Sequence, residues 1–186
     1  MNYPASKLPE VGTTIFTVMS QMAAEHNAIN LAQGFPDFNG PQLLLDAVGE
    51  HVAKGANQYA PMPGILPLRE QIADKVQKLY GRAVCPNKEV TVTSGATEAI
   101  YAAITAVVSA GDEVVILDPA FDCYDPAIIL NGGKAVHLQL QAPEFKLDWQ
   151  ALAAVISDKT RLIIFNSPHN PTGSVMSEDD IRALNK

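Results

Sequence analysis

The sequence has little cysteine, no excess of basic charge and no long hydrophobic run, and each absence argues against a class of protein. Cys85 and Cys123 lie far apart without metal-ligand spacing, so we expect free thiols in a reducing cytoplasm. A net charge of −7 argues against a nucleic-acid surface, which needs a basic face. No apolar run approaches the roughly 20 residues that span a bilayer, and residues 1–5 lack the regions of a signal peptide. We therefore expect a cytoplasmic protein with no nucleic-acid or membrane partner.

What the sequence does contain is typical of a folded globular protein. Hydrophobic residues make up 47% of the chain and charged residues 18%, which argues against disorder. A length of 186 residues suffices for one well-buried domain and is short for two. No internal repeat interrupts this pattern.

The N-terminal part of the chain predicts helices separated by stretches rich in glycine and proline. Apolar residues recur at helical spacing over residues 14–25, 42–54 and 66–80, and Gly81 is placed to end the third helix. We expect residues 1–40 to form an N-terminal arm or part of a small domain. Residues 41–186 are then the first part of a large α/β domain.

From residue 89 onward, the predicted strands and helices alternate. Strands are predicted at residues 89–93, 114–117, 135–140 and 162–165, and helices after residue 93, at 123–130, at 149–156 following Asp148, and over 178–186. Such alternation predicts a mostly parallel sheet with helices on both faces. Ligands of open α/β sheets bind at the carboxyl ends of the strands, so the segments that follow each strand are the candidate site.

The first candidate segment joins the strand at 89–93 to the next helix. The first N–H groups of a helix have no intrahelical partner and attract anions. Gly95 and Ala96 leave the backbone accessible to a phosphate, while Ser94 and Thr97 add hydroxyl donors. The alternative is a plain N-cap in which Ser94 or Thr97 satisfies helix donors. The segment is neither a Walker loop nor the dinucleotide pattern G-x-G-x-x-G, which argues against an unrelated nucleotide-binding domain.

The second candidate segment places Phe121 just beyond the strand at 114–117, which Pro119 ends. A flat aromatic ring at this edge could stack on a planar cofactor. The alternative is that Phe121 covers the end of the sheet as an ordinary core residue.

The third candidate segment is the run 166–173, directly after the strand at 162–165. Pro168 and Pro171 restrict the backbone around His169 and Asn170, so the Asn170 amide, which both donates and accepts, is held in one orientation. It suits an oxygen on a ring. The alternative is an Asx-type turn. A lone loop histidine such as His169 is expected to be a polar surface or hydrogen-bonding group.

Together these segments resemble those of the fold-type I pyridoxal phosphate enzymes, specifically the class I/II aminotransferases. Gln33–Phe38, Asn57–Tyr59 and Phe121–Tyr124 are similar to the branch of kynurenine and bacterial methionine aminotransferases. The resemblance covers nearly the whole chain from about residue 8. It implies a homodimer that transfers an amino group from an amino acid to a 2-oxo acid, using pyridoxal 5'-phosphate as electron sink.

The resemblance also implies roles for individual residues. Gly95, Ala96 and Thr97 would bind the cofactor phosphate, and Tyr59 would reach the phosphate of the partner subunit. Phe121 would stack on the pyridine ring, and Asn170 would hydrogen-bond the phenolic oxygen of that ring. Gly34 would lie against the substrate carboxylate. No metal site is implied.

The resemblance places the remaining machinery downstream of residue 186. The lysine that forms the Schiff base, the aspartate that pairs with the pyridinium nitrogen and the arginine that binds the substrate carboxylate are all expected there. Strands that separate 90–93 from 162–165 in the family also come later. We therefore expect this chain to be a fragment, the N-terminal part of a protein about twice as long, inactive alone. Two alternatives stay open: a noncatalytic binding or regulatory module, and a carbon–sulfur lyase on the same fold.

Overall fold

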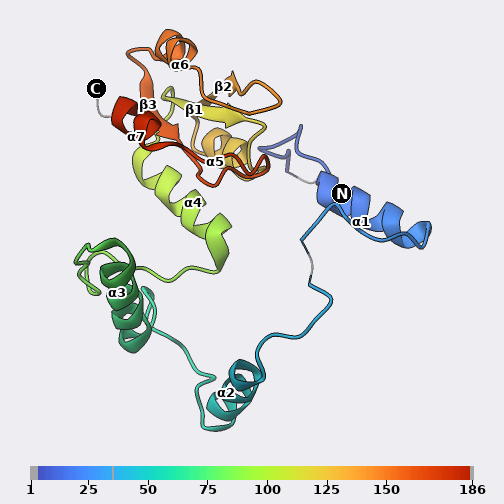
Figure 1. Ribbon diagram of the computed structural model, residues 1–186, viewed down its shortest axis with the longest axis vertical. Helices are drawn as coiled ribbons and strands as arrows, with labels where there is room; N and C mark the ends of the chain where they lie inside the picture. The colour runs from blue at the N-terminus through green and yellow to red at the C-terminus, as the bar shows by residue number, and fades with distance from the viewer. Residues whose placement is uncertain (1–3, 35, 185–186) are drawn as a thin grey trace. The chain divides into compact units, whose positions relative to one another are not determined.

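The computed structural model describes residues 4–34 and 36–184 (Figure 1). The chain forms two compact units: Gly12–Thr93, and Met1–Val11 together with Ser94–Lys186. The predicted boundary between an arm at residues 1–40 and a large domain at 41–186 divides the chain differently and stays a prediction.

A parallel sheet forms the centre of the second unit. Its strands β1 (Glu113–Asp118), β2 (Lys134–Gln139) and β3 (Thr160–Ile164) lie in the order β2-β1-β3, and β1 pairs in parallel with both neighbours. Residues 114–117 of β1 form an unbroken apolar run and are all buried. Such a run is typical of a strand covered on both faces, so the sequence itself selects β1 as the central strand.

Helices cover both faces of this sheet. Ile116 of β1 packs with Ile104 of α4 (Gly95–Val107) and Ile128 of α5 (Tyr124–Leu130). Its neighbour Val115 points to the other face and packs with Leu152 of α6 (Trp149–Val155). The alternation of side chains along a strand thus divides the core into two clusters. The predicted α/β class, a parallel sheet flanked by helices, is confirmed.

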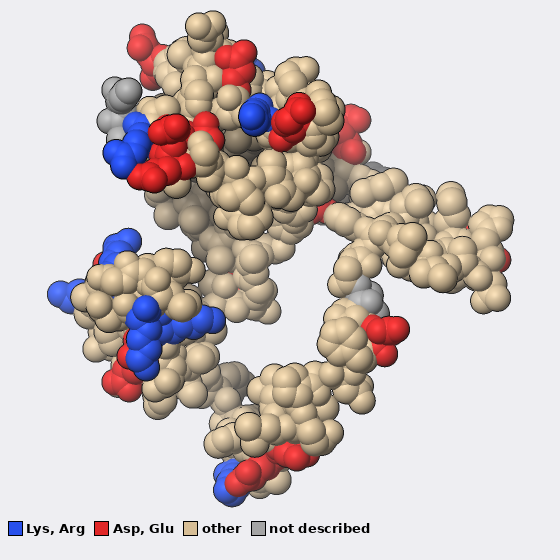
Figure 2. All heavy atoms as spheres, in the orientation of Figure 1, with Lys and Arg blue, Asp and Glu red and all other residues tan. Residues whose placement is uncertain are grey.

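The last helix, α7 (Glu178–Leu184), begins with a reciprocal cap. The Asp180 N–H donates to Ser177 Oγ at 3.2 Å, and the Ser177 N–H donates to Asp180 Oδ2 at 2.8 Å. The hydrogen bonds from Ser177 lower the pKa of Asp180. Its other oxygen, Oδ1, accepts from Trp149 Nε1 at 3.2 Å and so connects α7 to α6. Acidic side chains gather at α7 on the face shown in Figure 2, where they complement the positive end of the helix dipole.

The first unit contains the helices α1 (Ile15–Glu25), α2 (Gln42–Ala53) and α3 (Leu66–Tyr80), within a residue of the predicted ends. Thr14 caps α1 by accepting from the Thr17 N–H, and Gly81 ends α3 in the left-handed conformation. Neither α1 nor α2 carries a buried residue in the described part of the chain. Across residues 4–34 and 36–184, no helix combines the length and the apolar character needed to cross a membrane.

A buried arginine joins two loops near the end of the unit Gly12–Thr93. Arg69 of α3 is only 8% exposed, and its guanidinium donates to the carbonyl oxygens of Gly64 at 3.0 Å and Pro86 at 2.7 Å. Two loops far apart in sequence are therefore held together by one side chain, whose planar fork of donors suits several acceptors at once.

The predicted strand at residues 89–93 is wrong. Val90 is buried, as expected for an apolar residue of an alternating segment, but the backbone of residues 89–93 is not part of a sheet. The Val92 N–H donates to the Pro63 carbonyl at 3.0 Å. A strand requires a neighbour that accepts and donates along a ladder. Among the described residues, none pairs with this segment.

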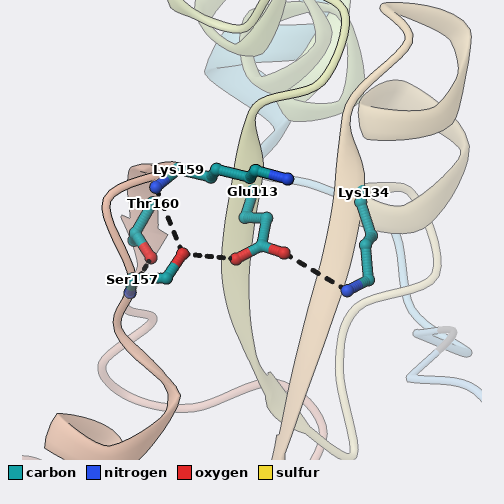
Figure 3. A network of polar contacts seen from close by, with 5 residues as sticks. All are labelled: Glu113, Lys134, Ser157, Lys159 and Thr160. Atoms are coloured by element: carbon teal, nitrogen blue, oxygen red, sulfur yellow. Dashed lines mark hydrogen bonds and ion pairs between the residues drawn. The ribbon is translucent and has the colours of Figure 1, made fainter.

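The amino ends of the strands are joined by a polar network (Figure 3). Glu113 of β1 accepts from Ser157 Oγ at 2.7 Å and from Lys134 Nζ of β2 at 3.2 Å. Thr160 of β3 completes the network, since its Oγ1 accepts from the Ser157 N–H at 2.9 Å. The hydrogen bonds from Ser157 and then Lys134 lower the pKa of Glu113. The network occupies the edge opposite to the candidate site.

Candidate functional site

The carboxyl edge of the sheet collects the second and third candidate segments, because β1 and β3 are parallel and adjacent. Helix α4 also extends toward this edge. Arg161 Nε at the start of β3 donates to the Val107 carbonyl at 2.9 Å, which fixes the last turn of α4 at the amino edge. Ile104 and Ile100 then pack along the sheet face toward the helix start. All three segments thus belong to one unit.

The first turn of α4 is accessible. Residues 95–97 are exposed, and Gly95 has φ +86°, a conformation that favours glycine. A Cβ added at Gly95 would meet no atom within 4 Å among the described residues. Ser94 occupies the N-cap position but makes no side-chain capping bond, so that alternative is wrong for Ser94. Its N–H donates instead to the Glu98 carboxylate.

Phe121 lies half-buried at the end of β1. Its ring meets that of Tyr124 edge to face, with 5.9 Å between the centroids, and packs against the cluster that contains Ile116. It also lines a cavity of about 140 Å³ together with Asp118 and His137. The ring therefore covers the end of the core, as the simpler alternative predicts. Stacking on a cofactor stays a prediction.

The run after β3 folds around His169, which is only 7% exposed. The side-chain Nδ1 of His169 lies 2.8 Å from Thr172 Oγ1. The backbone N–H of His169 donates to the Ser174 carbonyl at 2.8 Å, and its backbone carbonyl accepts from the Gly173 N–H at 2.7 Å. Gly173 permits this tight turn with φ +74°. Of the two forms of the expectation, a polar surface or a hydrogen-bonding group, the second holds, because His169 is buried and hydrogen-bonded. The nearby Thr-Gly pair was the signal that the loop turns back on the imidazole.

Asn170 is exposed at the tip of this turn. Its N–H donates to Asn166 Oδ1 at 2.7 Å, so Asn166 supplies the Asx-type contact that was the alternative for the run. The side-chain amide of Asn170 makes no hydrogen bond to any residue that the structure describes. The amide is consequently available to an external group.

A second hollow, of about 340 Å³, lies at the same edge and was not predicted. Leu117, Leu140 and Phe165, at the ends of the strands, form part of its wall, and His169 and Asp180 provide polar groups. The first two belong to the cluster that packs on α6, so this hollow opens on the face opposite to α4. The predicted strands include each of these apolar residues, but the sequence does not predict the space between them.

Tyr59 and Gly34 belong to the other compact unit. The Tyr59 side chain is fully exposed, at 104%. Gly34 is exposed as well, and a Cβ added there would meet no described atom within 4 Å. The described residues therefore do not themselves require glycine at position 34.

Comparisons with known proteins identify relatives along nearly the whole chain. The family model for aminotransferase class I and II matches residues 26–186. A methionine aminotransferase of Escherichia coli (strain K12) is 56% identical over 181 residues, which are 97% of this chain and 47% of that protein. A probable N-succinyldiaminopimelate aminotransferase of Mycobacterium tuberculosis is 43% identical over 182 residues, 96% of this chain and 46% of that protein.

Solved structures agree with these relatives. A crystal structure from Escherichia coli, described with a methionine aminotransferase function, superposes with a TM-score of 0.95 at 55% identity over 99% of this chain and 48% of that chain. The N-succinyldiaminopimelate aminotransferase structure from Mycobacterium tuberculosis gives 0.92 at 42% identity, over 98% of this chain and 48% of that chain. The chain spans about half the length of the curated relatives that it matches. The predicted fold type I is confirmed.

Proposed function

Because this chain belongs to the class I and II aminotransferases, we propose that the whole protein is a pyridoxal-phosphate-dependent aminotransferase. It moves an amino group from an amino acid to a 2-oxo acid. The observation that carries this proposal is the family match over residues 26–186. Methionine is the first proposed amino donor, given the 56% identity to a methionine aminotransferase. Aromatic amino acids and kynurenine follow.

Two features of the unit that contains the sheet support this cofactor. The open, exposed first turn of α4 suits a phosphate, with the backbone N–H groups of Gly95, Ala96 and Thr97 and the Thr97 hydroxyl as donors. The exposed amide of Asn170 suits the ring's phenolic oxygen. The Glu98 carboxylate, which accepts from Ser94, would repel a phosphate, and we propose that it rotates to solvent when the phosphate binds.

The residues of this chain would bind and orient the cofactor, which when bound supplies an electron sink for chemistry at the substrate's α-carbon. Phe121 would limit tilting of the ring from one side. Asn170, held by the turn around His169, would fix its rotation. The lysine that exchanges the proton is proposed to lie outside residues 1–186.

We further propose a cytoplasmic homodimer. Full exposure of the Tyr59 ring supports a role at a partner surface, where its hydroxyl would donate to the phosphate in the other subunit. Gly34 would leave room for the substrate carboxylate. Cys85 and Cys123 are free thiols, as a reducing compartment favours.

The test is an amino-transfer assay on the whole protein, loaded with pyridoxal phosphate, with methionine and a 2-oxo acid. We expect both products, the new amino acid and the new 2-oxo acid, in equal amounts. Asn170→Ala should weaken cofactor binding about tenfold, since one hydrogen bond to a charged or polar oxygen is lost. Gln77→Ala, on α3, is the control. Release of ammonia and a thiol without a new amino acid would establish the lyase instead, and absence of any turnover would contradict both.

A further inference from the structure

The imidazole of His137 contacts two aspartates that lie on either side of Phe121 in the sequence. Its Nδ1 lies 2.8 Å from Asp118 Oδ2, and its Nε2 lies 3.5 Å from Asp125 Oδ1. Asp118 is the last residue of β1, and Asp125 lies in the first turn of α5. One side chain of β2 therefore contacts both ends of the segment 119–124 that carries the aromatic ring.

The strand register explains how His137 reaches both carboxylates. His137 of β2 pairs with Ile116 of β1, and Ile116 faces the α4 and α5 side of the sheet. Side chains two residues apart share a face, so Asp118 emerges on the same side as Ile116. Helix α5 begins at Tyr124 and packs on that same face, which brings Asp125 toward the imidazole.

The Asp125 contact also meets a need of that carboxylate. Asp125 Oδ1 is buried, and among the described residues it accepts no hydrogen bond of normal geometry. A buried carboxylate oxygen without a polar neighbour is costly. The ring nitrogen at 3.5 Å supplies such a neighbour.

We propose that His137 is a positioning residue for Phe121. His137 contacts Asp118 and Asp125 and so fixes the two ends of the segment 119–124. The fixed ends in turn set the orientation of the Phe121 ring, which this segment carries. His137 and Phe121 line the same cavity of about 140 Å³. We assign the imidazole no contact with the cofactor: its effect on the ring is through Asp118, Asp125 and the segment between them. This inference rests on the proposed cofactor-binding role of Phe121.

The effect is expected to be moderate, for two reasons. The His137 side chain is 46% exposed, so solvent weakens both contacts. The Phe121 carbonyl also accepts from the Tyr124 N–H at 3.2 Å, and the two rings pack together, which retains part of the geometry.

The test uses His137→Phe in the whole protein, which keeps a planar ring and removes both polar contacts. Hydrogen exchange of the apoprotein should become faster at residues 119–125, and the dissociation constant for pyridoxal phosphate should rise about threefold to tenfold. The visible circular dichroism per bound cofactor should fall, because a less ordered Phe121 ring would hold the cofactor ring in a less uniform orientation. A merely structural role would lower the denaturation midpoint without changing this signal. His51→Phe, on the exposed α2, is the matched control.

Asp125→Ala removes only the longer contact and should change the same readouts in the same direction by a smaller amount. Wild-type exchange at residues 119–125, or an unchanged dissociation constant and dichroism in His137→Phe, would overturn the inference. Failure of the proposed function is distinguishable, because the wild-type protein itself would then neither bind pyridoxal phosphate nor transfer an amino group. The exchange experiment on the apoprotein would still report on the contacts of His137.

Discussion

The central strand β1 and the helices α1 and α2 carry similarly apolar side chains with opposite degrees of burial. Ile116 of β1 is 1% exposed, whereas Ile15 of α1 is 64% exposed and Leu44 of α2 is 59% exposed. Ile15 and Leu44 were predicted from helical spacing, and Ile116 from the apolar run of a strand. The difference teaches that apolar spacing indicates where a helix lies without indicating whether its side chains are buried, because the hydrogen bonds of a helix are local. Burial requires a partner surface, which the described residues provide for β1 but not for α1 or α2.

Hydrogen exchange of the 186-residue chain would test this comparison most strongly. We expect the amides of β1 to exchange slowest, about a thousandfold or more slower than those of α1 and α2, because core strands open only with global unfolding and unsupported helices fray. Mass spectrometry of peptides covering each element measures the difference. Equal protection of α1 and β1 would contradict the comparison.

Truncation of a buried and an exposed apolar side chain gives the next largest difference. Ile116→Ala should lower the free energy of unfolding by about 2–5 kcal/mol, since it leaves a cavity in the core. Leu44→Ala in the same chain should change it by less than about 0.5 kcal/mol. Chemical denaturation of both variants measures the two values. A cost at Leu44 as large as that at Ile116 would mean that α2 is covered after all.

Arg69 provides the test for the unit formed by Gly12–Thr93. Arg69→Ala should lower the free energy of unfolding by about 1–3 kcal/mol, because the carbonyl groups of Gly64 and Pro86 lose their donor. Arg82→Ala is the matched control, since it removes only an exposed ion pair with Glu89, worth about 0–1 kcal/mol. Arg69→Lys should be intermediate. Identical losses for the two alanine variants would show that Arg69 does not hold the loops.

The smallest expected effect concerns the pH dependence of the sheet's amino edge. The folded pKa of Glu113 is lowered from its ordinary value of 4.5, so its stabilising contribution is complete above that value and is lost as the pH falls through the lowered pKa. Ser157→Ala should raise this pKa toward the ordinary value of 4.5, so that Glu113 contributes less stability above that pH and less stability is lost on acidification. Denaturation between neutral and acidic pH measures the shift. Lys134→Ala should cause a smaller one, and an unshifted profile in Ser157→Ala would argue against the network.

Local signals in the sequence predicted most of the secondary structure. Asp148 caps α6 by accepting from the N–H groups of Gln150 and Ala151, and α3 begins and ends where its proline and glycine indicate. The prediction of a strand at residues 89–93 failed because these residues have the apolar alternation of a strand, whereas the pairing of a strand depends on residues far away in the sequence. The bounds of the helices, which depend on local signals, were predicted nearly correctly.

The candidate site was predictable in its position but not in its detail. The three segments were identified because they follow strands or begin a helix, and β1, β3 and α4 do bring them to one unit. The burial of His169 depends on how the turn closes, and the contact of His137 with Asp118 depends on strand register. Neither can be obtained from residue types alone, because both join residues through tertiary geometry.

The hydrogen bond from Trp149 to Asp180 gives the protein a built-in optical reporter. Trp149 is the single tryptophan of these 186 residues, and its indole N–H contacts the carboxylate that also caps α7. Detachment of α7 would release the indole to water and shift its fluorescence emission. Docking of the helix that follows the candidate site can thus be followed in solution, without a label, by the light that this one side chain emits.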